Sequence, residues 1–260
     1  MSVARNGSIE LAYDVAGDGP NLLLIPGVAS TRPIWNLVRP VLARRFRTIA
    51  FDLRDSGEST IAEGPYALTD LVADATAVMD AAGADRAHVL GHSLGGAIAQ
   101  ELALAFPGRV EELTLVSTWA RGDLYTKNVV TLLQSLTANT PDDFSFLAAL
   151  LYVGAGTTTL RDNDLTIMTA AALALGSLAP RAAIARQWDV AKTADTLDRI
   201  ASLAMPVRVI WGTEDKLIPP WLGAQLAQAI PAARTMPIEG CGHLPMVAAP
   251  EAFVQCVAQA

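Results

Sequence analysis

Short apolar runs bounded by turn residues recur along the chain and predict buried β-strands. The run from Asn21 to Ile25 is closed by Pro26-Gly27, which is typical of a strand followed by a turn. Four further runs share this pattern: Phe46 to Phe51, Ala87 to Leu90, Leu113 to Val116 and Val207 to Trp211. Ile9 to Val15 instead alternates apolar and polar residues, which predicts a half-buried strand at the edge of a sheet.

Helical stretches separate these strands. They are expected at Ile34 to Arg45, Leu68 to Ala82, Leu94 to Phe106, Pro220 to Ala229 and Pro250 to Ala258. Gly83 and Pro107 follow two of them, where a helix is expected to end. Such alternation indicates the α/β class, in which a mostly parallel sheet is covered by helices on both faces.

Residues 119–200 break this alternation. They contain one helical stretch after another and no convincing strand, with turn residues at Asn139 to Asp142 and at Ala179-Pro180. We therefore expect a helical lid (cap) at 119–200, inserted before the last strands, while 1–118 and 201–260 form the core domain. In the alternative interpretation these helices pack on the flank of the core and take no part in binding.

Composition and charge favour one globular domain with small-molecule partners. The chain has 260 residues, 52% of them hydrophobic, which is enough for a single buried core. The formal net charge is −7, the isoelectric point is near 4.9, and Lys and Arg form no cluster in the sequence. We therefore expect neither nucleic acid nor an anionic membrane surface as a partner.

The sequence carries no sign of export or of a cofactor. The first residues lack the apolar core of a signal peptide, and no apolar stretch is long enough for a membrane span. Cys241 and Cys256 have no metal or redox spacing, and no phosphate-binding loop is present. The expectation is a cytoplasmic protein with reduced cysteines and without metal or cofactor. The oligomeric state is left open.

Ser93 lies in the pentapeptide Gly91-His92-Ser93-Leu94-Gly95, which fits the pattern G-x-S-x-G. The pentapeptide follows one predicted strand and opens a predicted helix, which is the setting that a nucleophile on a strained turn requires. Glycines two positions to either side allow the close backbone packing of such a turn. A serine hydroxyl also needs a general base.

The chain has three histidines, and elimination favours His243 as that base. His88 begins a strand, so its side chain is expected to pack in the sheet or point away from Ser93. His92 is adjacent to Ser93 on a sharp turn, where neighbouring side chains diverge, so a structural role is expected for it. His243 follows Gly242 on a loop shortly before the last helix.

Asp215 is the carboxylate expected to orient His243. It follows the strand Val207 to Trp211, at the strand end where open α/β sheets bind ligands. The order Ser93, Asp215, His243 is the order found in hydrolases with such a serine turn. Glu214, one residue away, is the alternative.

The sequence resembles the α/β-hydrolase superfamily. The resemblance rests on the strand–Gly-His-Ser-Leu-Gly-Gly–helix arrangement, the segment Phe51 to Ser59, the Gly212 to Asp215 loop and Gly242-His243, and it extends from about Ile9 to Phe253. It is strongest toward small esterases and lactonases, including 3-oxoadipate enol-lactonase and polyketide methylesterases. It implies an eight-stranded, mostly parallel sheet and a serine hydrolase that works through an acyl-enzyme.

The resemblance also implies an oxyanion hole made by two backbone N–H groups. Leu94 and Val28 are expected to supply them, although Pro26-Gly27 stands where most members have His-Gly. Enol-lactonases of the superfamily share that departure, while simple sequence drift explains it equally well. Asp55 replaces a usual glycine, and an ion pair with Arg54 near the mouth of the site is one interpretation of it; a structural role in the loop, rather than a catalytic one, is expected for both residues.

The expected substrate is a small to medium, partly apolar ester or lactone. Aromatic residues of the lid, chiefly Trp119, Tyr125, Phe144 and Trp188, are the expected substrate contacts, with Phe146, Tyr152 and Met168 as further candidates; helix packing alone also accounts for them. The alternative functions are hydrolysis of a C–C bond in a ring-fission product and a non-hydrolytic, ligand-sensing role.

Overall fold

The computed structural model describes residues 1–174, 178–231 and 233–258. Its eight strands form one mostly parallel sheet, as the resemblance implies. The strand order is β1-β2-β4-β3-β5-β6-β7-β8, and only the β1–β2 and β2–β4 pairs are antiparallel. The strands are β1 (Ser2–Asn6), β2 (Ile9–Ala16), β3 (Asn21–Ile25), β4 (Arg47–Phe51), β5 (Ala87–His92), β6 (Val110–Val116), β7 (Val207–Gly212) and β8 (Arg234–Ile238).

The two outermost strands, β1 and β8, lie outside the predicted set. The prediction that Ile9 to Val15 forms an edge strand is wrong, because β1 pairs along β2 with Ala4 opposite Leu11. Each outer strand is exposed along much of its length and mixes charged with apolar residues. Such strands lack the continuous apolar run that marks the strands buried on both faces.

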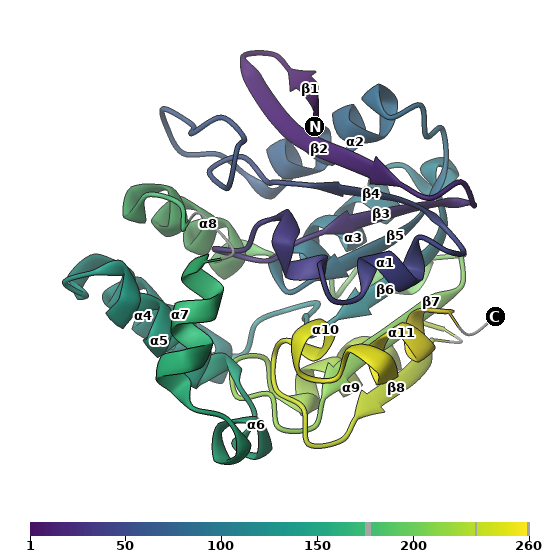
Figure 1. Ribbon diagram of the computed structural model, residues 1–260. Coiled ribbons are helices and arrows are strands. Elements are labelled where there is room, and N and C mark those ends of the chain that lie inside the picture. Colours follow the sequence, from purple (N-terminus) through teal and green to yellow (C-terminus); the bar gives the residue numbers. More distant parts are fainter. Residues whose placement is uncertain (175–177, 232, 259–260) are drawn as a thin grey trace.

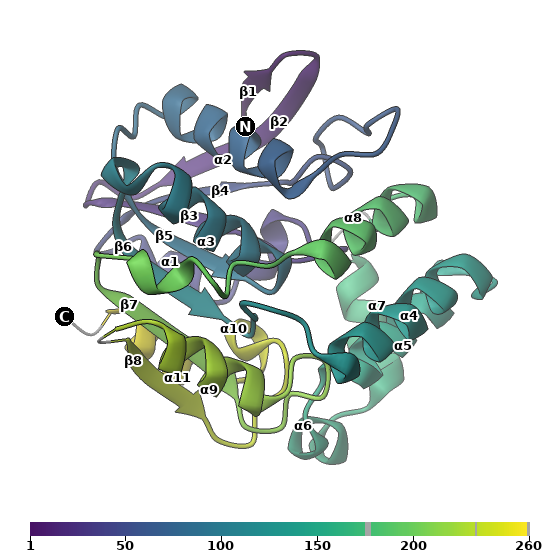
Figure 2. The same ribbon diagram turned by 180° about the vertical axis from the view of Figure 1, so that it is seen from behind.

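Successive residues of the central strands point to opposite faces, and each face carries its own helices (Figures 1 and 2). One face packs against α2 (Leu68–Ala81), α3 (Leu94–Ala105) and α9 (Pro220–Ala229). The other packs against α1 (Arg39–Leu42), α10 (Pro245–Ala248) and α11 (Pro250–Ala258). Short 3₁₀ turns complete the core: η1 (Arg32–Trp35), η2 (Pro107–Arg109) and η3 (Ile200–Ser202).

The helix expected from Ile34 to Arg45 is divided into the short elements η1 and α1. Pro40 explains the division: it lies in the first turn of α1, where a proline is tolerated, and it lacks the N–H group that a continuous helix would use to bond the carbonyl four residues earlier. The other expected core helices lie within one residue of their predicted bounds.

Five α-helices lie between β6 and β7 in the described residues: α4 (Leu124–Asn139), α5 (Asp143–Gly154), α6 (Thr157–Asp162), α7 (Leu165–Ala174) and α8 (Arg181–Thr193). We call residues 124–193 the helical segment. Asp123 and Asp142 cap α4 and α5 by accepting hydrogen bonds from the backbone of Thr126 and Ser145. The segment stands at one end of the sheet, beside the carboxyl ends of the parallel strands (Figure 1).

Two further properties concern the chain as a whole. Cys241 and Cys256 are free thiols. Within the described residues, none of the helices is both long and apolar enough to cross a membrane.

Candidate active site

Ser93 occupies a sharp turn between β5 and α3. Its φ and ψ angles are 54° and −120°, a left-handed conformation that is unfavourable for any residue with a Cβ atom. Two hydrogen bonds hold the turn: the Ser93 N–H donates to the Val116 carbonyl at 2.9 Å, and the Thr118 hydroxyl donates to the Ser93 carbonyl at 2.8 Å. The end of β6 and the loop that follows it therefore fix the strained residue from both sides.

Gly91 and Gly95 allow the chain to approach itself at this turn. A Cβ atom on Gly91 would lie 2.1 Å from the Gly95 carbonyl oxygen, and one on Gly95 would lie 2.2 Å from the Ile25 carbonyl oxygen. Both contacts involve backbone atoms and leave no space for a side chain. Steric exclusion therefore explains why both positions of the motif are glycine, in agreement with the close backbone packing predicted from the sequence.

His243 and Asp215 are hydrogen-bonded in the same region. His243 Nδ1 lies 2.9 Å from Asp215 Oδ2. Asp215 Oδ1 accepts from the backbone N–H groups of Leu217 and Ile218, both at 2.9 Å, so the carboxylate is buried and held by its own loop. Since a carboxylate oxygen accepts, His243 carries a proton on Nδ1, and its neutral form has a free lone pair on Nε2.

The other two histidines have structural contacts. His88 Nε2 lies 2.8 Å from the Thr114 hydroxyl within the sheet. His92 Nε2 lies 2.9 Å from the carbonyl oxygen of His243. Burial lowers the pKa of each to about 3, so both are neutral near pH 7. This agrees with the roles expected for them.

The loop of residues 26–31, which we call the oxyanion loop because the sequence predicts an oxyanion donor at Val28, lies against the Ser93 turn. A Cβ atom on Gly27 would lie 3.0 Å from Ser93 Cβ. Val28 lines the cavity described below, and Leu94 is the first residue of α3, where backbone N–H groups have no partner within the helix. Leu94 thus lies at the turn that carries Ser93, and Val28 lies on the loop that packs against this turn.

A cavity of about 460 Å³ connects these groups with the helical segment. Its polar lining consists of Ser93, His92 and His243 together with Ser30, Thr31 and Asn36, and much of the remainder is apolar. The described apolar lining includes Ile34, Leu37, Leu147, Leu150, Leu151, Met168, Leu173, Leu178, Trp188, Leu217, Leu244 and Val247. Within the described lining there is no Asp, Glu, Lys or Arg.

Of the four predicted aromatic contacts, Trp188 belongs to the described lining of this cavity. The other three lie elsewhere. Trp119 is packed in the core beside β6, and its carbonyl accepts from Gln100. Tyr125 donates to the carbonyl of Lys216 and lies edge-on to Trp221, and Phe144 is partly exposed in the first turn of α5.

The leucines of α5 that line the cavity lie outside the predicted set of substrate contacts, which was chosen mainly among aromatic residues. Leu147, Leu150, Leu151 and Gly154 recur at intervals of three and four, as do Met168, Ala171 and Ala172 of α7. This spacing places each set on one helix face, which is the sequence signal for a cavity wall. The signal is weak here, because both helices carry apolar residues over most of their surface.

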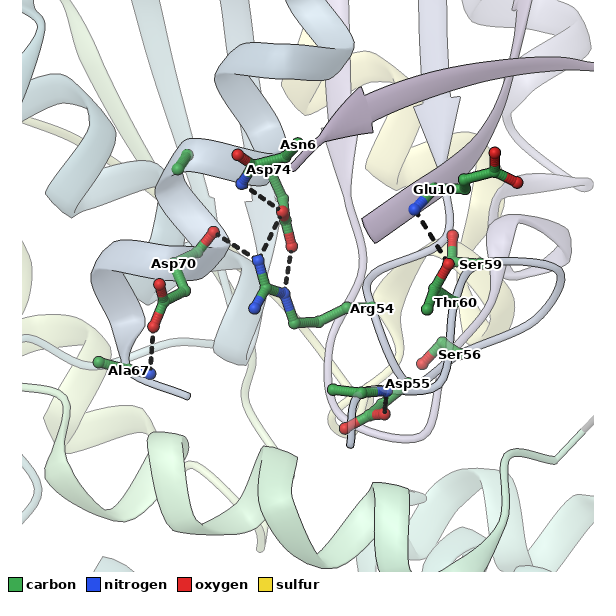
Figure 3. Close-up of polar contacts among 12 residues, drawn as sticks. Asn6, Glu10, Arg54, Asp55, Ser56, Ser59, Thr60, Ala67, Asp70 and Asp74 are labelled. Atoms are coloured by element: carbon green, nitrogen blue, oxygen red, sulfur yellow. Dashed lines mark hydrogen bonds and ion pairs between the residues drawn. The ribbon is translucent and has the colours of Figure 1, made fainter. Parts of the chain in front are cut away.

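The expected ion pair between Arg54 and Asp55 is wrong. Arg54 Nε lies 2.6 Å from Asp74 Oδ2, whereas Asp55 accepts from Arg186 of α8 at 2.7 and 2.8 Å. Asp55 has a φ of 69°, so the two adjacent side chains leave the turn in different directions; Figure 3 shows Arg54 running toward Asp74.

Glu214 is directed away from the histidine. Its carboxylate accepts from the Thr158 backbone N–H at 2.7 Å and from the Thr158 hydroxyl at 2.8 Å, and these bonds lower its pKa. Of the two adjacent carboxylates, Asp215 is therefore the one hydrogen-bonded to His243. In the described part of the chain, no three His, Cys, Asp or Glu side chains gather as metal ligands would.

A mostly parallel sheet covered on both faces, with a strained serine at the end of a central strand, defines an α/β hydrolase. The sequence comparison agrees: the model of the alpha/beta hydrolase fold family matches residues 20–250, and the chain belongs to that family. Hydrolase is accordingly the class of the protein.

Known relatives resemble the chain along nearly its whole length. A protein of Azorhizobium caulinodans named "Putative carbamate hydrolase RutD" is 29% identical over 259 residues, covering 97% of this chain and 95% of its own. The structure of a hydrolase from Pseudomonas aeruginosa has a TM-score of 0.87 at 29% identity, and the match covers 98% of this chain and 96% of the hydrolase. An enol-lactonase from Burkholderia xenovorans has a TM-score of 0.88 at 24% identity, covering 98% of each chain, and shows the shared fold.

Proposed function

We propose that this protein is a serine hydrolase that cleaves a carboxylic ester or lactone of a small to medium, partly apolar substrate. Ser93 is the nucleophile, His243 the general base and Asp215 the residue that orients it. The observation that carries the proposal is the Asp215–His243 hydrogen bond of 2.9 Å, made by a histidine that lines the same cavity as the strained Ser93.

The first half of the reaction forms an acyl-enzyme. His243 Nε2 takes the Ser93 proton while Oγ attacks the carbonyl carbon, and Asp215 stabilises the imidazolium that results. The N–H groups of Val28 and Leu94 bind the oxyanion, and each such donor contributes about 3 kcal/mol to transition-state stability in enzymes of this kind. When the C–O bond breaks, His243 gives its proton to the departing alkoxide.

The second half releases the acid. Water attacks the acyl group, His243 accepts its proton, and the collapse of the second oxyanion returns that proton to Ser93. For a lactone, the alcohol stays tethered to the acyl group, so hydrolysis has to be faster than ring closure. Both half-reactions use the same donors and the same base.

The helical segment supplies much of the apolar wall of the cavity, which supports its interpretation as a lid rather than as a flanking domain. The absence of Asp, Glu, Lys and Arg from the described lining favours an uncharged substrate, because a buried carboxylate without a cationic partner is unfavourable. The Azorhizobium relative is named for carbamate hydrolysis. The same groups would attack a carbamate carbonyl, and the apolar lining favours one with a sizeable apolar substituent.

Labelling and hydrolysis together test this proposal. A fluorophosphonate should add one phosphonyl group to Ser93, located by mass spectrometry of peptides, and Ser93→Ala should remove both the label and the hydrolysis of p-nitrophenyl butyrate. A substrate panel should rank neutral esters and lactones above carboxylate-bearing lactones and ring-fission dienoates. Full hydrolysis by a folded Ser93→Ala variant would overturn the assignment.

A further inference from the structure

Gln187 lies on α8 of the helical segment and is completely buried. All three hydrogen-bonding groups of its side-chain amide are used by the core domain. Its Oε1 accepts from the Ala29 backbone N–H at 2.9 Å. Its Nε2 donates to the carbonyl of Arg54 at 3.1 Å and to the hydroxyl of Ser56 at 2.8 Å. One side chain of the lid thus joins the oxyanion loop to the loop of residues 54–56, which Figure 3 shows with its neighbours.

Ala29 follows directly after Val28, the proposed oxyanion donor. Its φ angle is 56°, the left-handed region that an alanine adopts only when its surroundings hold it there. The N–H of Ala29 belongs to the peptide plane next to Val28. The hydrogen bond that the Ala29 N–H donates to Gln187 therefore holds both the strained residue and one of the two peptide planes that flank Val28.

The neighbours of Gln187 attach α8 to its surroundings. Arg186 makes a two-point ion pair with the buried Asp55, and Trp188 lines the cavity while its indole N–H donates to Thr137 of α4 at 3.2 Å. Three consecutive residues of one helix thus bind the core domain, hold the oxyanion loop and form part of the substrate wall.

From this arrangement we infer that Gln187 is a positioning residue, which sets the Val28 N–H for the oxyanion and makes the oxyanion hole depend on the placement of α8. The inference rests on the proposed function. An oxyanion forms only along the reaction path, so the loss of this positioning should reduce kcat while KM changes little.

The test compares Gln187→Met with Ser56→Ala, using p-nitrophenyl butyrate. Methionine fills a similar volume and cannot accept from Ala29, whereas Ser56→Ala removes one contact of the same amide and leaves the Ala29 bond in place. Complete loss of an oxyanion donor lowers kcat about 100- to 1000-fold, so a misplaced donor in Gln187→Met should lower it about 10- to 100-fold. KM should change by less than about threefold, and Ser56→Ala should keep kcat within about twofold.

An alkyl boronic acid provides the second readout. Its tetrahedral adduct with Ser93 places an oxygen in the oxyanion hole, so its inhibition constant should weaken in Gln187→Met in parallel with kcat. A general loss of packing would instead raise KM or lower the active fraction measured by phosphonate titration. Gln187→Glu keeps an acceptor for Ala29 and should retain more of kcat than Gln187→Met.

The outcomes are separate from those of the proposed function. A wild-type protein that neither hydrolyses the ester nor takes up the phosphonate would overturn the proposed function. A wild-type enzyme that does both, with a folded Gln187→Met variant that keeps kcat and boronate affinity within about twofold, would overturn the positioning role alone. If Gln187→Met does not fold, the Gln187→Glu variant decides: a kcat loss as large as that expected for methionine would count against the Ala29 bond.

Discussion

His92 Nε2 lies 2.9 Å from the carbonyl oxygen of His243, and the two imidazole rings are 4.8 Å apart. Because a carbonyl oxygen can only accept, His92 carries its proton on Nε2. Its Nδ1 is buried without a hydrogen-bond partner among the described residues. The residue adjacent to the proposed nucleophile therefore holds the backbone of the proposed base.

Replacement of His92 by leucine should lower kcat about tenfold, because one buried hydrogen bond is worth about 1 to 1.5 kcal/mol. The bond fixes the peptide that carries His243, so its loss loosens the base with respect to Ser93. His92→Gln is the matched control, since its amide N–H can reach the same carbonyl. Steady-state kinetics on a neutral ester measures the effect, and equal activity of the leucine and glutamine variants would contradict it.

Acid should weaken the fold through His88 and His92. Burial lowers the pKa of each to about 3. The ordinary value of about 6.5 applies to the unfolded chain, so between these two values the unfolded state binds one more proton per histidine. The free energy of unfolding is therefore fully retained above pH 6.5. It falls with acidification by about 1.4 kcal/mol per pH unit for each histidine.

Urea unfolding at pH 7.5 and pH 5.0 measures this loss, to which each histidine should contribute about 2 kcal/mol. His88→Gln removes one titrating group and leaves the carboxylates unchanged. The difference in stability between the two pH values should therefore shrink by that amount in the variant. An unchanged difference would mean that the pKa of His88 is not lowered in the folded protein.

The central sheet and the Ser93 turn were predictable because each has a local signal. Strands buried on both faces need unbroken apolar runs, and a serine on a strained turn needs glycines at fixed positions. The outer strands β1 and β8 have no such requirement, since they are largely exposed. For this reason six strands could be placed from the pattern alone, and the total of eight came from the resemblance.

The partners of charged side chains were less predictable, because sequence spacing carries no information about them. Asp55 and Arg186 are 131 positions apart and form a two-point ion pair. Asp215 could be favoured over Glu214 from its place after β7, but the contact of Glu214 with Thr158 depends on how α6 packs against that loop. The residues of α5 that line the cavity were equally hard to predict, since this helix is apolar over most of its surface.

Removal of the Arg186 charge should destabilise the fold strongly. The Asp55 side chain is completely buried, so Arg186→Met leaves a carboxylate without its cationic partner, at a cost of about 3 to 5 kcal/mol. The exposed pair Arg161–Asp162 is the control, and Arg161→Met should change stability by less than about 1 kcal/mol. Denaturant unfolding measures the free energy of unfolding of both variants. Similar losses in the two would show that the buried pair stabilises the fold no more than the exposed pair does.

Glu214 and Asp215 form a matched pair for the last prediction, because the two carboxylates are adjacent in sequence and have different partners. Asp215→Asn should lower kcat about 10⁴-fold, since an amide that donates to His243 favours the wrong tautomer. Glu214→Gln keeps an oxygen that accepts from Thr158 and should leave kcat within about threefold, with a small loss of stability at the α6 contact. Kinetics and thermal unfolding of both variants separate the two roles. If Glu214→Gln lost activity as severely as Asp215→Asn, the orienting role could no longer be assigned to Asp215 alone.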